Sequence, residues 1–159
     1  MSPRPYKIAL NGYGRIGRCV LRALHERGAG SAIEIVALND LADQASIEYL
    51  TRFDSTHGRF PGAVAVDGDC LHINGGCVKV LRQSTPEAID WAALEVDLVL
   101  ECSGQYTSRA AAQRFIDAGA PRLLLSQPMN SEADIDATIV YGVNQQQLTG
   151  AELLVSNAS

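Results

Sequence analysis

The chain has 159 residues, of which 47% are hydrophobic and 19% charged, so it can form one domain with a sizeable core. The net charge is −5 and the sequence has no basic run or basic–aromatic stripe, which argues against a nucleic-acid partner. No apolar run approaches the ~20 residues that span a bilayer, and residues 1–7 are too polar for a secretion signal, so we expect no membrane partner and a cytoplasmic location.

The first predicted strand, residues 6–11, leads directly into a glycine-rich turn and a helix over residues 14–27. The turn contains Gly12, Gly14 and Gly17 in the spacing G-x-G-x-x-G. In such a unit the first glycine makes the tight turn, the second leaves room for a phosphate, and the third lets the helix pack close to the strand. The helix start favours an anion. The stretch therefore predicts a dinucleotide site; a glycine-rich turn without a ligand is the alternative.

The second predicted strand covers residues 33–39, and its nearly continuous apolar run is typical of a parallel strand covered on both faces. Asp40 follows this strand, close to the ~20-residue spacing at which an acid binds the adenosine ribose. A carboxylate there accepts from ribose hydroxyls and repels a 2′-phosphate, which predicts NAD rather than NADP. The alternative is a loop carboxylate that caps the next helix, predicted over residues 43–51.

An insertion is predicted between this helix and the rest of the sheet. Residues 52–62 predict an ordered loop, in which His57 is more typical of a surface residue than of a catalytic one. Residues 63–81 predict antiparallel strands with a hairpin turn at Asp67-Gly68. Such strands are not part of a minimal doubly wound unit, so we expect a meander inserted at the edge of the sheet.

Two further parallel strands, predicted at residues 96–100 and 123–125, end in small polar residues. Ligands of open α/β sheets bind beyond the carboxyl ends of the strands. Ser103 and Gly104 follow the first of these strands and Ser126 follows the second. Each is therefore a candidate contact for the middle of a cofactor, with ordinary turn chemistry as the alternative.

The remaining elements complete an α/β fold. Residues 86–94 predict a short helical connection in which Trp91 is a packing anchor, and a helix is predicted over residues 109–118. Short strands are predicted at residues 135–140 and 153–155. The expected fold is a doubly wound, mostly parallel sheet with an inserted antiparallel meander.

The cysteines form no C-x-x-C pair and have no metal-site spacing, so we expect no metal and four reduced, buried thiols. They are Cys19, Cys70, Cys77 and Cys102.

Four stretches together resemble the N-terminal, NAD-binding half of the glyceraldehyde-3-phosphate dehydrogenase family: residues 11–18, 55–60, 101–104 and 156–159. The resemblance covers nearly the whole chain and implies a Rossmann fold, NAD as cofactor, a small phosphorylated aldehyde as substrate and a homotetramer at full length. In that family Ser-Asn-Ala-Ser immediately precedes the nucleophilic cysteine. The resemblance therefore implies that residues 1–159 are the dinucleotide-binding domain, that the catalytic domain and every catalytic residue lie outside this chain, and that the chain alone is inactive.

Within the family, residues 134–144 resemble the erythrose-4-phosphate dehydrogenase branch. This branch oxidises D-erythrose 4-phosphate to 4-phosphoerythronate through a cysteine thioester, in pyridoxal 5′-phosphate biosynthesis. One alternative is the phosphorylating glyceraldehyde-3-phosphate dehydrogenase of glycolysis. The other is a non-catalytic nucleotide-binding module.

The resemblance also implies roles for single residues. The backbone of Arg15 and Ile16 matches the position that meets the pyrophosphate, and Ser84 stands where the family often has an arginine near the adenine. Ser159 matches a residue that helps to hold the substrate phosphate. The implied cofactor contacts are, in chain order, Gly12, Gly14, Arg15, Ile16, Gly17, Asp40, Ser84, Ser103, Gly104 and Ser126.

Overall fold

A computed structural model describes residues 3–28 and 32–158 of the chain. Its main sheet contains β1 (Tyr6–Asn11), β2 (Ile33–Asn39), β5 (Val64–Asp67), β6 (Cys70–Ile73), β7 (Gly76–Leu81), β8 (Leu98–Glu101), β9 (Leu123–Leu125), β10 (Ala137–Thr138) and β11 (Leu154–Ser156). The helices are α1 (Arg15–Glu26), α2 (Gln44–Arg52) and α3 (Arg109–Asp117), with short 3-10 turns η1 (Pro86–Ala88), η2 (Glu132–Asp134) and η3 (Gln145–Gln147). A separate hairpin joins β3 (Phe53–Asp54) to β4 (Gly58–Arg59).

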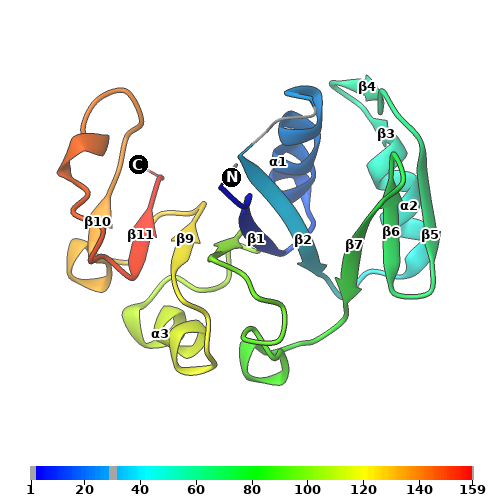
Figure 1. Cartoon of the computed structure of the whole chain (residues 1–159). Helices are drawn as coiled ribbons and strands as arrows, with labels where there is room; N and C mark the ends of the chain where they lie inside the picture. Colours follow the sequence, from blue (N-terminus) through cyan, green and yellow to red (C-terminus); the bar gives the residue numbers. More distant parts are fainter. Residues whose placement is uncertain (1–2, 29–31, 159) are drawn as a thin grey trace.

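The strand order across the main sheet is β10-β11-β9-β8-β1-β2-β7-β6-β5 (Figure 1). The chain moves outward from β1 to β2 and β7, then returns to the other side of β1 to place β8 and β9. This reversal makes the doubly wound topology, with its switch point between β1 and β8. Within the described part of the main sheet, only the pairings of β6 with β5 and β7 are antiparallel, so the predicted edge meander and the predicted fold class are confirmed.

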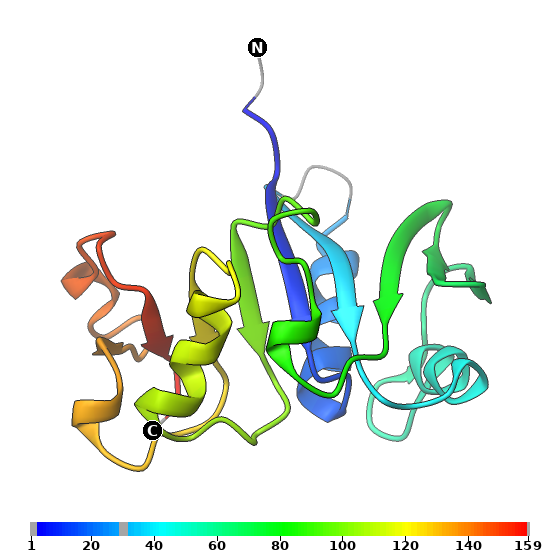
Figure 2. The same cartoon turned by 90° about the horizontal axis from the view of Figure 1, so that it is seen from below.

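Helices cover both faces of the sheet. Figure 2 shows α3 in front of the strands and α1 behind them. The strands alternate accordingly: Ile8 and Leu10 of β1 join the core with α1 and α2, whereas Ala9 joins the core with α3. The second core contains Trp91, which is 1% exposed, so the predicted packing anchor is confirmed.

The predicted strand over residues 135–140 is mostly wrong, because only Ala137–Thr138 pair as β10. The backbone N–H of Val140 instead donates to Oδ1 of Asn144, at 2.7 Å, and Nδ2 of Asn144 donates to the carbonyl of Thr138, at 3.0 Å. The side chain of Asn144 thus takes over backbone groups that strand pairing would use, and it folds the chain into a turn.

The expectation of four reduced thiols is also wrong. Cys70 and Cys77 form a disulfide between β6 and β7, whose antiparallel pairing brings their Cα atoms to 5.5 Å. The two cysteines are seven positions apart and form no short motif such as C-x-x-C, so the sequence did not indicate the disulfide. Among the described residues, Cys19 and Cys102 are free. The cytoplasmic location stays a prediction.

Within the described part of the chain, no helix has the length and apolar character that crossing a membrane requires.

Candidate functional site

The turn after β1 lies at the switch point, against the turn after β8. Gly12 has a φ of +94°, a region that glycine adopts without strain, and its N–H donates to the carbonyl of Asn39 at 2.8 Å. A Cβ atom at Gly12 would lie 2.7 Å from the backbone nitrogen of Ser103. Gly12 is therefore required both by the turn and by the close approach of the two loops.

The other two glycines of the turn have opposite surroundings. A Cβ atom at Gly17 would overlap the carbonyl oxygen of Gly12, so this glycine lets α1 pack directly against the turn. A Cβ atom at Gly14, the N-cap of α1, would meet nothing within 4 Å. No side chain caps this helix start, and its first turn carries no acid. The result is an open cradle of backbone N–H groups, which fits a phosphate.

Asp40 lies half-buried at the carboxyl end of β2 and holds the glycine turn in place. Its Oδ2 accepts the N–H of Tyr13 at 2.7 Å, and its Oδ1 accepts the N–H of Ala42 at 2.9 Å. Helix α2 is capped by Asp43, which accepts the N–H of Ser46 at 2.8 Å. The alternative that Asp40 caps this helix is therefore wrong. Each carboxylate oxygen keeps a further lone pair for a ligand.

A row of buried and half-buried polar side chains, here called the carboxyl-end ladder, crosses the sheet beneath this region. Asn39 donates through Nδ2 to Oδ1 of Asn11 at 2.9 Å and to the carbonyl of Gln83 at 2.9 Å. Asn11 donates through Nδ2 to Oε1 of Glu101 at 3.0 Å. Gln127 donates through Nε2 to Oε2 of Glu101 at 2.6 Å. The ladder thus links the ends of β7, β2, β1, β8 and β9.

Glu101 accepts hydrogen bonds from two of the three small residues predicted at this end of the sheet. Its Oε1 accepts the N–H of Ser103 at 3.0 Å, and its carbonyl accepts the N–H of Ser126 at 3.0 Å. Ser103 and Gly104 are exposed, and Gly104 has a φ of +77°. Ser103 is therefore bonded to the buried carboxylate of Glu101 and Ser126 to its backbone carbonyl, and Gly104 directly follows Ser103 in the chain.

The carboxyl-end ladder was not predicted from the sequence. Its signal was present, because Asn11, Asn39 and Glu101 are each the polar last residue of a strand and follow at least three apolar residues. Such residues are normally exposed, and only the pairing of the strands shows that these three are buried together.

The remaining predicted contacts are more dispersed. Ile16 is 50% exposed in the first turn of α1. Ser84 is exposed on the side of the sheet where Asp40 lies, directly after Gln83, whose N–H donates to Oδ1 of Asn39 at 2.8 Å. Ser159 lies outside the described residues.

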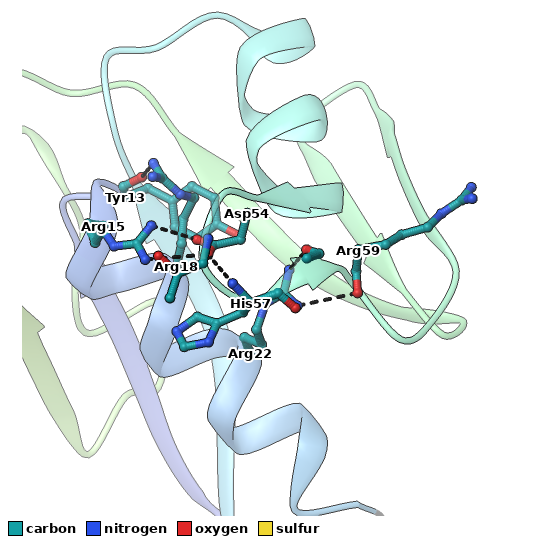
Figure 3. A network of polar contacts seen from close by, with 9 residues as sticks. Tyr13, Arg15, Arg18, Arg22, Asp54, His57 and Arg59 are labelled. Atoms are coloured by element: carbon teal, nitrogen blue, oxygen red, sulfur yellow. Dashed lines mark hydrogen bonds and ion pairs between the residues drawn. The ribbon is translucent and has the colours of Figure 1, made fainter.

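The side chain of Arg15 forms an ion pair with Asp54 of the β3–β4 hairpin, at 2.8 Å (Figure 3). Asp54 also accepts the N–H groups of Thr56 and His57 at 2.8 and 2.7 Å. The His57 and Thr56 N–H groups and the Arg15 guanidinium together lower the pKa of Asp54 to about 2. Only the backbone of Arg15 is thus left for the cradle.

Arg22 of α1 also holds this hairpin in place. Its side chain is buried, with the residue 7% exposed, and it donates to the carbonyl of Gly58 at 3.0 Å. Residues 52–62 are therefore ordered, as predicted. The His57 side chain is exposed and extends away from these contacts (Figure 3).

Of the two free thiols among the described residues, Cys102 lacks the surroundings of a nucleophile. Burial raises the pKa of Cys102 to about 11, against a smaller opposite effect of a hydrogen bond with Ser126. A thiol in this state stays protonated at neutral pH, whereas the thiolate is the reactive form. Cys19 is half-buried on α1.

The switch point, the open helix cradle and the acid at the end of β2 together define a dinucleotide-binding domain of the Rossmann type. Residues 6–109 match the family model described as "Glyceraldehyde 3-phosphate dehydrogenase, NAD binding domain". The chain belongs to this family, and its cofactor is NAD.

Two curated relatives come from Cupriavidus necator. The chain is 49% identical over 153 residues to the chromosomal glyceraldehyde-3-phosphate dehydrogenase and 48% identical over 153 residues to the plasmid one. Each match covers 96% of this chain and 45% of the relative. The chain therefore spans about half the length of the curated relatives it matches.

Proposed function

We propose that this chain is the NAD-binding part of a phosphorylating glyceraldehyde-3-phosphate dehydrogenase. The observation that carries the proposal is the 49% identity over 153 residues to the chromosomal glyceraldehyde-3-phosphate dehydrogenase of Cupriavidus necator. The chain's own geometry supports it, because the cradle at Gly14 is open and uncapped.

Each part of the cradle would have a separate task. The backbone N–H groups of Arg15 and Ile16 would donate to the pyrophosphate, and Asp40 would accept from the ribose hydroxyls. Ser103, Gly104 and Ser126 would line the nicotinamide side, with Ser84 towards the adenine. Bound NAD would supply the hydride acceptor, while these residues position it.

The nucleophilic cysteine and its base are proposed to lie outside residues 1–159. Three of the four cysteines support this, because Cys102 is held protonated and Cys70 is bonded to Cys77. Residues 1–159 would then form the dinucleotide-binding domain of a homotetrameric cytoplasmic enzyme. Ser159 would help to hold the substrate phosphate.

A second candidate substrate is D-erythrose 4-phosphate. In that reaction water, rather than phosphate, would accept the acyl group from the cysteine thioester. The resemblance of residues 134–144 to that branch favours it. The names of the two curated relatives favour glyceraldehyde 3-phosphate.

Turnover of the full-length protein with each aldehyde, with and without inorganic phosphate, separates the two candidates. We expect NAD reduction with glyceraldehyde 3-phosphate that depends on phosphate. Phosphate-independent turnover with erythrose 4-phosphate alone would support the second candidate instead. The 159-residue chain by itself is expected to show no turnover with either aldehyde, and turnover above the blank would contradict the placement of the nucleophile.

A further inference from the structure

Glu101 is 0% exposed, and the carboxyl-end ladder is oriented towards it from the β1 side. Oδ1 of Asn39 accepts the backbone N–H of Gln83, so the other end of that amide must be the donor to Asn11. Since Asn11 accepts through Oδ1, its Nδ2 is the group that faces Glu101. A backbone group thus fixes the direction of this half of the ladder.

The other half of the ladder is oriented in the same way. Nε2 of Gln127 donates to the carbonyl of Tyr106 at 3.3 Å, so the NH₂ end of Gln127 also faces Glu101. The backbone N–H of Ser103 supplies a third donor. Both oxygens of Glu101 therefore accept N–H groups, as an ionised carboxylate does.

This negative charge has no cationic partner among the described residues. The ion pairs of the described chain all lie elsewhere. The three donors to Glu101 are neutral amides. In a buried setting such a charge acts on its surroundings more strongly than it would in water.

We propose that Glu101 is a specificity-determining residue that favours oxidised over reduced cofactor. The inference rests on the proposed function, which puts the nicotinamide beside Ser103, Gly104 and Ser126. The oxidised ring carries a positive charge and the reduced ring is neutral. A fixed carboxylate directly beneath the backbone of Ser103 attracts the first and not the second. It therefore strengthens binding of the oxidised, substrate form of the cofactor relative to the reduced, product form.

The test measures the Kd of NAD⁺, NADH and ADP-ribose by calorimetry in the full-length protein. ADP-ribose has the same phosphates and adenosine ribose but no nicotinamide. In Glu101→Gln, we expect the Kd of NAD⁺ to rise roughly tenfold relative to that of NADH, with the Kd of ADP-ribose nearly unchanged. An unchanged NADH-to-NAD⁺ ratio of Kd values would overturn the inference, and so would equal weakening of all three ligands, since that indicates a purely structural role.

A second pair of variants protects the test against misfolding. In Glu101→Gln, the new side-chain NH₂ group would face one of the N–H donors that now bind Glu101, such as Nε2 of Gln127. The double variant Glu101→Gln/Gln127→Ala removes the charge together with that donor. Gln127→Ala alone keeps the charge and is the matched control. The double variant is expected to lose NAD⁺ preference relative to this control. Failure of the unaltered protein to bind ADP-ribose would instead contradict the proposed function, so the two failures are distinguishable.

Discussion

Gly14 and Gly17 are three residues apart, and their surroundings predict opposite effects of the same substitution. At Gly14 the added methyl group of Gly14→Ala points into open space, where a phosphate would lie. We expect this variant to lose NAD affinity, with a smaller loss of stability than Gly17→Ala, since alanine at the N-cap of α1 meets no neighbouring atom. At Gly17 the methyl group overlaps the carbonyl of Gly12, so Gly17→Ala is expected to lower stability by about 1–3 kcal/mol.

Urea unfolding and NAD calorimetry on both glycine variants check this pair, and each variant is the control for the other. Unchanged NAD binding in Gly14→Ala would contradict the placement of the pyrophosphate in the cradle.

Asp40 predicts the choice between the two cofactors. The unaltered protein is expected to bind NAD more tightly than NADP, because the carboxylate repels a 2′-phosphate. In Asp40→Ala the difference between the NAD and NADP affinities should become smaller. The NAD affinity should fall as well, because the backbone N–H of Tyr13 loses its hydrogen-bond acceptor. Calorimetry with both cofactors measures the change, and Asp43→Ala, which removes only the cap of α2, is the control. Equal affinity for the two cofactors in the unaltered protein would count against the ribose assignment.

Asp54 predicts how stability depends on pH. Its pKa is lowered from an ordinary value near 3.8 to about 2, chiefly by the N–H of His57. A lowered pKa stabilises the folded state above the unfolded pKa, so this contribution is complete above about pH 5 and is lost as the pH falls towards 2. Asp54→Asn should therefore reduce stability at pH 7 and much less near pH 2.

Urea unfolding at the two pH values tests the Asp54 prediction, with Asp67→Asn as the control, since Asp67 is an exposed acid at the end of β5. A stability difference that stays constant with pH would show that the shift is absent.

The single residues that could be predicted from the sequence are those with local causes. Gly12 and Gly17 follow from a strand–turn–helix pattern within a few positions of chain. Glu101 could not be found in this way, because its burial depends on strands that are distant in sequence. The anchoring of Tyr13 by Asp40 was missed for the same reason.

At the scale of elements, the register between strands decides which strand-end residues lie side by side, and the hydrophobic pattern of each strand does not reveal this. Asn11 pairs directly with Asn39 on one side and with Glu101 on the other, which is why three strand ends form one ladder. The hydrophobic pattern predicts that these strands exist and are parallel. It does not predict that β1 and β2 shift register between Ile8 and Ala9. It also overpredicts β10, where Asn144 competes for the backbone.

The packing of α3 on the sheet depends on Phe115, which is 0% exposed and lies 4.8 Å from Tyr106 and 5.9 Å from Trp91 between ring centroids. Phe115→Ala is expected to cost about 3–5 kcal/mol of unfolding free energy, because it leaves a cavity between these rings. Leu41→Ala, at a side chain that is 68% exposed, is the control and should change stability by less than about 0.5 kcal/mol. Urea unfolding measures both, and similar values for the two would contradict the described core.

At the scale of the whole molecule, a groove of about 570 Å³ lies between α1 and the strands β2 and β7. Much of its lining is apolar and includes Leu24, Ile35 and Val78. An exposed apolar groove of this kind favours association between copies of the chain. We expect the 159-residue chain by itself to self-associate as its concentration rises, which sedimentation velocity would detect. A monomer at every concentration tested would contradict this expectation.

Asp40 has a consequence for attempts to redesign the cofactor preference. The carboxylate that would exclude NADP is also the acceptor for the N–H of Tyr13, at 2.7 Å. Replacing it with a small apolar side chain would admit the larger coenzyme and, in the same step, release the loop that must grip it. An engineered exchange therefore has to retain a side-chain oxygen at this position, as in Asp40→Asn, and gain its new cation from a neighbouring residue.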